Sequence, residues 1–147
     1  METAPLEALL ELSRAAAATS RDLDGHGLSF SELRLLRAVA AAPAGRTRPG
    51  DLAAELGLTA SGVTRAVLPL EKRHIVQRTP DGRDGRASLV SLTAAGTELL
   101  ADAQATAAHA AQRLLRRLSL GQTRQLQRLL GEIVPGGANR NGSAKES

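Results

Sequence analysis

The sequence predicts a mostly α-helical protein with one small β-hairpin. Of its 147 residues, 42% are hydrophobic but only 1% are aromatic, and Phe30 is the single aromatic side chain apart from the histidines. The core must therefore be built from leucine, alanine and valine, and the first two are strong helix formers. Apolar residues recur at helical spacing along most of the chain, whereas only two short runs, 75–79 and 87–93, resemble strands.

The first part of the chain predicts two helices. Residues 5–18 carry leucines at helical spacing, and the sequence DGHG (24–27) then breaks the pattern. Ser29 or Ser31 can cap a second helix, 31–41, which has an apolar stripe along one side. The following segment, PAGRTRPG (43–50), is predicted to be a turn-rich connection.

The segment that follows has the layout of a helix-turn-helix. A short helix, 49–56, is ended by Gly57, and Thr59 is placed to cap another helix that begins at Ala60. Two helices joined by a short turn that contains glycine define this motif. Taken alone, the pattern fits an ordinary helical hairpin equally well.

The two strand-like runs decide between these readings. Between them lies a charged, glycine-rich tip, which predicts a hairpin with a long loop. A helix-turn-helix followed directly by such a hairpin is a winged helix. Residues 46–86 carry eight basic and five acidic side chains, so this segment holds +3 of the formal charge of +4. A basic patch of this kind fits nucleic acid as a partner, and arginine on the loop can enter a minor groove.

Two further helical stretches, 93–118 and 119–134, have apolar stripes but no place in a minimal winged-helix core. We therefore expect them, together with the first helix, to form a subunit interface. The composition of the last 13 residues predicts a disordered tail. The expected organisation is an N-terminal dimerisation helix and connection (5–30), a winged helix-turn-helix DNA-binding domain (31–93), C-terminal dimerisation helices (94–134) and the tail (135–147).

Longer motifs resemble the MarR family of winged-helix transcriptional regulators. The sequence VTRAV lies on the second helix of the motif, and the pattern D-x-R-x-x-x-V-x-L-T-x-x-G runs from Asp84 to Gly96. With the flanking helices, the resemblance covers roughly residues 5–134. It implies a homodimer on a pseudo-palindromic operator in double-stranded DNA. It also implies a repressor that is released by a small aromatic or phenolic ligand.

The chain departs from the family pattern at three places. His74 stands where a glycine is usual, directly after the second helix of the motif, at a position that often needs a left-handed backbone. Pro69 lies inside that helix and removes one backbone donor, so we expect a bend. The wing reads Asp-Gly-Arg where Asp-Arg-Arg is frequent, which removes one arginine.

Seven residues are candidates for the DNA-binding site. Helix-turn-helix proteins read base edges from the early turns of the second helix, where arginine binds guanine and hydroxyls reach bases or phosphates. On the wing, arginines are expected to contact DNA while an aspartate braces the loop. The predicted DNA-binding residues are Thr59, Ser61, Thr64, Arg65, Arg83 and Arg86, and Asp84 is the predicted brace.

No catalytic or cofactor site is predicted. The chain has no cysteine, which excludes disulfides and thiolate metal sites, and His26, His74 and His109 lack metal-ligand spacing. No apolar run approaches the length of a membrane helix, so a cytoplasmic protein is expected. Two alternatives remain open: a DNA-binding regulator or architectural protein without a small-molecule effector, and a winged-helix module that binds proteins.

Overall fold

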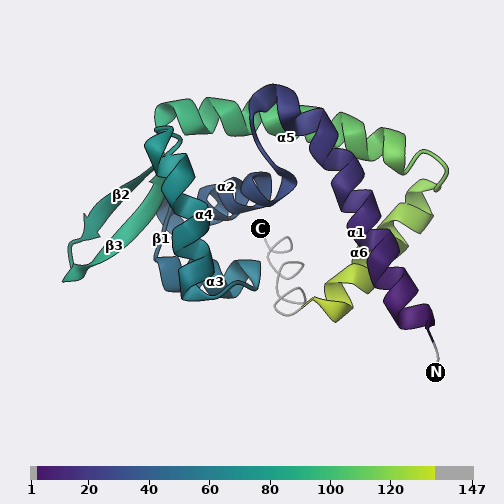
Figure 1. Ribbon diagram of the computed structural model, residues 1–147, viewed down its shortest axis with the longest axis horizontal. Coiled ribbons are helices and arrows are strands. Elements are labelled where there is room, and N and C mark those ends of the chain that lie inside the picture. Colours follow the sequence, from purple (N-terminus) through teal and green to yellow (C-terminus); the bar gives the residue numbers. More distant parts are fainter. Residues whose placement is uncertain (1–2, 135–147) are drawn as a thin grey trace, which may run out of the picture. The chain divides into compact units, whose positions relative to one another are not determined.

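The structure, a computed structural model, describes residues 3–134, apart from the side chains of Asp84 and Arg86. The predicted tail at 135–147 lies outside the described residues. Figure 1 shows the course of the chain. Its helices are α1 (Ala4–Leu23), α2 (Phe30–Ala41), α3 (Pro49–Leu56), α4 (Ala60–Lys72), α5 (Ala94–Leu114) and α6 (Leu120–Ile133), with short 3-10 turns η1 (Asp24–His26) and η2 (Pro43–Gly45).

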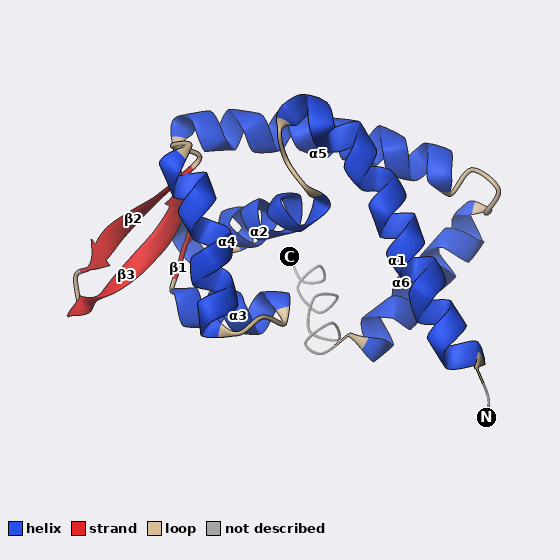
Figure 2. Ribbon diagram, in the orientation of Figure 1, coloured by secondary structure: helices blue, strands red, loops and turns tan. Residues whose placement is uncertain are grey.

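The strands form one small antiparallel sheet. Its strands β1 (Arg46–Thr47), β2 (Val76–Asp81) and β3 (Asp84–Leu92) lie in the order β1-β3-β2. Figure 2 shows the β2–β3 hairpin projecting from the helices that precede it. The predicted fold class, mostly α-helical with a small hairpin wing, is confirmed.

Two features of the sheet differ from the prediction. The turn-rich connection at 43–50 contains β1, whose Arg46 and Thr47 pair with Ser91 and Val90 of β3. The tip of the hairpin is also short rather than a long loop, because pairing continues to Asp81 and Asp84. The register shifts after Pro80, which pairs with Ser88. Proline donates no ladder hydrogen bond, so an irregularity at this position is expected.

Side chains at two helix starts explain where those helices begin. Ser29, rather than Ser31, caps α2: its Oγ accepts from the N–H of Glu32 at 3.1 Å, and the carboxylate of Glu32 accepts from the N–H of Ser29 at 2.8 Å. Ser119 and Gln122 make the same reciprocal pair at the start of α6. Each pair satisfies two backbone donors that a helix start otherwise leaves unbonded.

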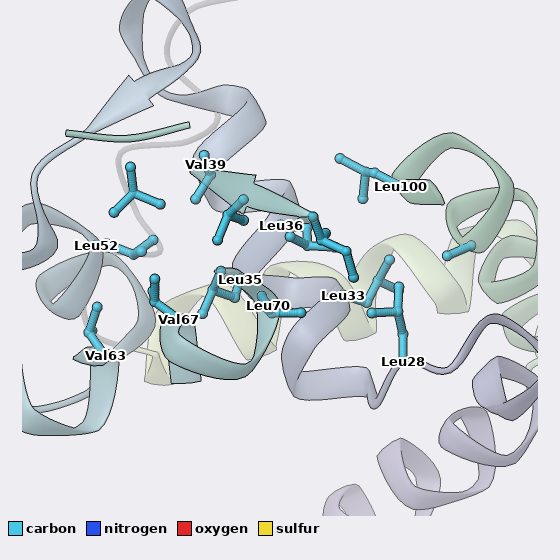
Figure 3. Close-up of a cluster of buried hydrophobic side chains, with 14 of the residues drawn as sticks. Leu28, Leu33, Leu35, Leu36, Val39, Leu52, Val63, Val67, Leu70 and Leu100 are labelled. Atoms are coloured by element: carbon cyan, nitrogen blue, oxygen red, sulfur yellow. The ribbon is translucent and has the colours of Figure 1, made fainter. Parts of the chain in front are cut away.

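The core is aliphatic, as the composition predicts. Figure 3 shows leucine and valine side chains of α2, α3 and α4 packed around Leu36 and Val39 of α2, both fully buried. Val76 and Val90 bring the sheet into the same cluster, and Leu100 brings in α5. Helices α2, α3 and α4 and the sheet are therefore held by one continuous core.

The chain divides into two compact units between Ala111 and Gln112. Within the first unit, α1 buries only Thr19 and Leu23, and its other end leaves large apolar side chains exposed. In the second unit, α6 buries no residue. The exposed leucines of α1 are Leu6, Leu9 and Leu10, and the exposed apolar residues of the second unit are Leu114, Leu118, Leu120, Leu129, Ile133 and Val134.

Candidate nucleic-acid interface

The local structure of α4 follows from the residues on either side of it. Gly57 ends α3 in the left-handed region, at φ +66°, and the N–H of Leu58 closes that end by donating to the carbonyl of Ala53. Thr59 then caps α4, since its Oγ1 accepts from the N–H of Gly62 at 3.1 Å. The helix runs through Pro69 to Lys72. The helix-turn-helix of the sequence prediction is therefore present.

Helix α4 has one buried face and one exposed polar face. Val63, Val67 and Leu70 are at most 1% exposed and fix the buried side against the core. The predicted residues Ser61, Thr64 and Arg65 are all exposed, within the first two turns. The spacing of three and four residues between Ser61, Thr64 and Arg65 places them on a shared side of the helix.

All three candidate hydroxyl groups, those of Thr59, Ser61 and Thr64, already make hydrogen bonds within the protein. The Oγ1 of Thr59 caps the helix and lies 3.2 Å from the Oγ of Ser61. The Oγ1 of Thr64 donates to the carbonyl of Ala60 at 3.2 Å, which leaves that oxygen as an acceptor toward any ligand. Arg65 therefore offers the strongest donor on the exposed polar face of α4, because its guanidinium carries five N–H groups.

Asp81, which was not among the predicted site residues, makes several hydrogen bonds at the wing tip. One carboxylate oxygen of Asp81 accepts from Nε of Arg48 at 3.0 Å and from a terminal nitrogen of the same guanidinium at 2.5 Å. The other oxygen accepts from the backbone N–H of Arg83 at 3.2 Å. The hydrogen bond from Arg83 and the pairing with Arg48 lower the pKa of Asp81 from its ordinary value.

The predicted wing residues are only partly described. Arg83 is exposed at the tip, directly after Gly82. Asp84 and Arg86 lie on β3, but their side chains are outside the described part, so the predicted brace and the second predicted wing contact stay predictions.

A tight backbone junction joins α4, the wing and α5. His74 has φ +58°, the left-handed conformation expected where the family carries glycine. The hydroxyl of Thr93 donates to the carbonyl of His74 at 2.6 Å and accepts from the N–H of Gly96 at 3.0 Å. A Cβ on Gly96 would lie 2.0 Å from the carbonyl oxygen of Ile75, so only glycine fits. The Leu-Thr-x-x-Gly part of the motif thus caps the start of α5 and allows it to pack closely against the base of the wing.

Further contacts hold the far end of α4. Arg73 donates to the carbonyl of Gly27 at 2.9 Å, which ties the helix end to the connection between η1 and α2. Glu71 and Arg78 form an ion pair of 3.2 Å between α4 and β2. The end of α4 therefore contacts both the wing and the loop before α2.

The Arg48–Asp81 pair was missed by the sequence analysis. The two residues are 33 positions apart, and no local pattern connects them. The contact between Asp81 and Arg83, however, does have a signal in the sequence. Aspartate followed by glycine often accepts from the N–H two residues ahead, so Asp-Gly-Arg at 81–83 predicts the contact with Arg83.

The three histidines are not brought together as a metal site. His26 is bonded to Thr106 of α5, with 2.7 Å between Nε2 and Oγ1. No group of three or more histidine, aspartate or glutamate residues in 3–134 is arranged to hold a metal ion. Over the same residues, no helix is long and apolar enough to cross a membrane.

A helix-turn-helix followed by a sheet with a projecting hairpin defines a winged helix-turn-helix protein. The sequence model of the MarR family matches residues 26–87, which run from η1 into β3. This winged-helix part of the chain is a MarR-family domain. No curated protein was found to match the chain.

Solved structures of transcriptional regulators share the fold over most of the chain. A probable transcriptional regulator from Pseudomonas aeruginosa is 27% identical with a TM-score of 0.80, covering 88% of this chain and 96% of its own. A MarR-family regulator from Rhodococcus sp. RHA1 is 27% identical with a TM-score of 0.78, covering 90% and 94%. Sco3205, a MarR-family regulator from Streptomyces coelicolor solved in complex with DNA, is 26% identical with a TM-score of 0.79, covering 88% and 86%.

Proposed function

We propose that this protein is a DNA-binding transcriptional regulator that inserts α4 into the major groove. The observation that carries the proposal is the exposed polar face of α4, where Ser61, Thr64 and Arg65 lie opposite a stripe buried in the core. A helix held by the core, with exposed polar side chains in its first turns, suits the reading of base edges. The similar regulator Sco3205, which was solved in complex with DNA, also supports DNA binding as the proposed function.

The wing supplies the second part of the proposed interface. Arg83 is exposed at its tip, and Arg86 follows three residues later in the sequence. Arginine attracts the phosphates and enters narrow minor grooves. In this proposal α4 selects the sequence, and the wing arginines add affinity and fix the orientation of the protein on the duplex.

We further propose that the protein acts as a homodimer on a pseudo-palindromic site. The support is the set of large apolar side chains left exposed on α1 and on residues 114–134. Patches of this kind mark interaction surfaces, and a chain whose core has a single aromatic side chain gains buried area by dimerising. Repression relieved by a small aromatic or phenolic ligand completes the proposal, on the basis of the family resemblance.

Fluorescence anisotropy tests the DNA-binding proposal. A labelled random-sequence duplex of roughly 30 base pairs, long enough for two half-sites a helical turn apart, is titrated across a salt series. The wild-type protein is expected to bind, with a logarithm of affinity that falls linearly with the logarithm of salt concentration. Failure to bind at low salt would favour the protein-interaction module instead.

Two arginine variants sharpen this test. On a duplex selected by the wild-type protein, Arg65→Ala should lose at least about tenfold in affinity, since a guanine contact by arginine is worth about 1–3 kcal/mol. Arg37→Ala is the matched control, because Arg37 is exposed on α2, outside both proposed interfaces, and its substitution removes the same charge. Equal losses in the two variants would contradict a specific role for α4.

Titration with benzoate and 2-hydroxybenzoate tests the effector. Either acid is expected to raise the melting temperature and to release the protein from the selected duplex, because a ligand that binds one state shifts the equilibrium toward it. A regulator without an effector would show neither change.

A further inference from the structure

We propose that the Arg48–Asp81 ion pair is the element that orients the wing for DNA, so that Arg48 and Asp81 are positioning residues for the interface. The inference rests on the proposed function, since it assigns a role within DNA binding. The two residues lie at opposite ends of the contact, on different parts of the fold. Arg48 stands between β1 and α3, at the entrance to the helix-turn-helix, and Asp81 is the last residue of β2 before the tip.

The carboxylate of Asp81 joins these two places. It accepts twice from the guanidinium of Arg48, at 3.0 and 2.5 Å, and once from the N–H of Arg83. Its side chain is only 11% exposed, whereas that of Arg48 is 51% exposed. A largely buried carboxylate with three donors has a fixed orientation, and it transmits that orientation to the backbone of Arg83.

Among the described residues of the wing tip, the glycines add no packing and the strand register is irregular. Regular pairing ends at Pro80 and Ser88, and the register shifts by the next pair, Asp81 and Asp84. A Cβ built on Gly82 or Gly85 would meet no atom within 4 Å, so neither position is packed against another part of the described structure. The contacts of Asp81 therefore come at the last pair of the ladder, directly after the register shift.

Two roles for Arg48 predict opposite effects of removing the Asp81 charge. If Arg48 were a phosphate contact that Asp81 partly neutralises, removing the carboxylate would raise the net positive charge there and strengthen binding. The loss of a negative charge close to DNA acts in the same direction. If the pair orients the wing, the same change must weaken binding, because the tip has to be ordered anew in the complex.

The experiment is a double-mutant cycle on DNA affinity. Wild type, Asp81→Asn, Arg48→Gln and the double variant are titrated against the duplex selected by the wild-type protein, with melting followed by circular dichroism. We expect each single variant to lose roughly fivefold in affinity, the cost of ordering one or two side chains on binding. The double variant should be no weaker than either single variant, since both substitutions break one contact.

Conservative and control variants separate orientation from simple loss of charge. Arg48→Lys keeps the charge but not the planar group, so it should recover only part of the affinity. Arg46→Gln, two residues earlier and exposed on β1, removes an equal charge outside the pair. Its effect on DNA affinity should therefore simply add to that of Asp81→Asn. If Asp81→Asn does not fold, the contrast between Arg48→Gln and Arg48→Lys still measures the pair.

The outcomes are distinct. If wild type binds DNA and Asp81→Asn binds equally well or more tightly, the pair does not orient the wing and the inference is wrong, while the proposed function stands. Additive losses of affinity in the double variant would assign Arg48 to direct contact with DNA. This result would also overturn the inference that the pair orients the wing. If wild type binds no duplex DNA, the proposed function fails first, and this inference fails with it.

Discussion

Replacing Gly96 with alanine should damage the junction between the wing and α5. The added Cβ would lie 2.0 Å from the carbonyl oxygen of Ile75 and 2.9 Å from its carbonyl carbon, so the backbone has to move. That oxygen accepts from the N–H of Thr93 at 3.1 Å and shares the Thr93 hydroxyl proton, at 3.2 Å, with the closer carbonyl of His74. Any displacement therefore weakens these hydrogen bonds and the cap that Thr93 gives to α5.

The change in the free energy of unfolding of Gly96→Ala is the sum of three destabilising terms and one stabilising term. Forcing a methyl group into a packed site costs about 1–3 kcal/mol, and losing a helix cap or a buried hydrogen bond costs about 1 kcal/mol each. Alanine returns about 1 kcal/mol through its higher helix propensity. The free energy of unfolding should therefore fall by about 2–4 kcal/mol, and the melting temperature by roughly 5–15 °C.

Circular dichroism in a urea series is the suitable assay, because the chain has no tryptophan or tyrosine for fluorescence. The variants are compared at one protein concentration, since association with a second copy would raise apparent stability. Gly50→Ala is the matched control, because a Cβ at Gly50 in α3 meets nothing within 4 Å. If Gly96→Ala is as stable as Gly50→Ala, α5 does not approach the Ile75 carbonyl in solution.

Three further predictions concern the helix end, the wing and the terminal helices. His74→Gly should raise the free energy of unfolding by about 0.5 kcal/mol in the same assay, because relief of the left-handed backbone slightly exceeds the added entropy of the unfolded chain. A clear loss of stability would mean that the imidazole makes a specific contact. Asp81 has a lowered pKa, so its contribution to stability is present above the unfolded pKa of about 4 and is lost as pH falls through the folded value. The stability difference between wild type and Asp81→Asn should accordingly shrink below about pH 4, and a difference that stays constant from pH 7 to pH 3 would contradict this. Deleting residues 119–147 should abolish dimerisation and DNA binding together, and a truncated protein that sediments as a dimer would refute the assignment of the interface.

The local parts of the fold were predictable from the sequence because their signals are local. Gly57 and Thr59 stand at adjacent helix ends and fix the turn of the helix-turn-helix. The left-handed backbone at His74 was expected because the family that the sequence resembles usually has glycine at this helix end. These features depend on backbone preferences and caps within a few residues, which a sequence displays directly.

The parts that could not be predicted depend on contacts between distant residues. Strand β1 has two residues, Arg46 and Thr47, too few to show any alternation, and it exists only because β3 lies beside it. The tip of the hairpin was predicted to be long because glycine and charged residues favour turns, yet pairing with Asp84 extends β2 to Asp81. The pairing of Arg48 with that aspartate likewise needs the folded arrangement of α3 and the wing.

The most direct test of the central claim is selection from a random-sequence duplex library by the full-length protein, followed by sequencing. We expect the retained duplexes to share an inverted repeat, with half-sites about one helical turn apart, as two copies of α4 in successive major grooves require. Arg65→Ala should relax or change the preferred bases within each half-site. Recovery of duplexes with no shared sequence, or of none at low salt, would contradict the claim that this winged helix reads DNA.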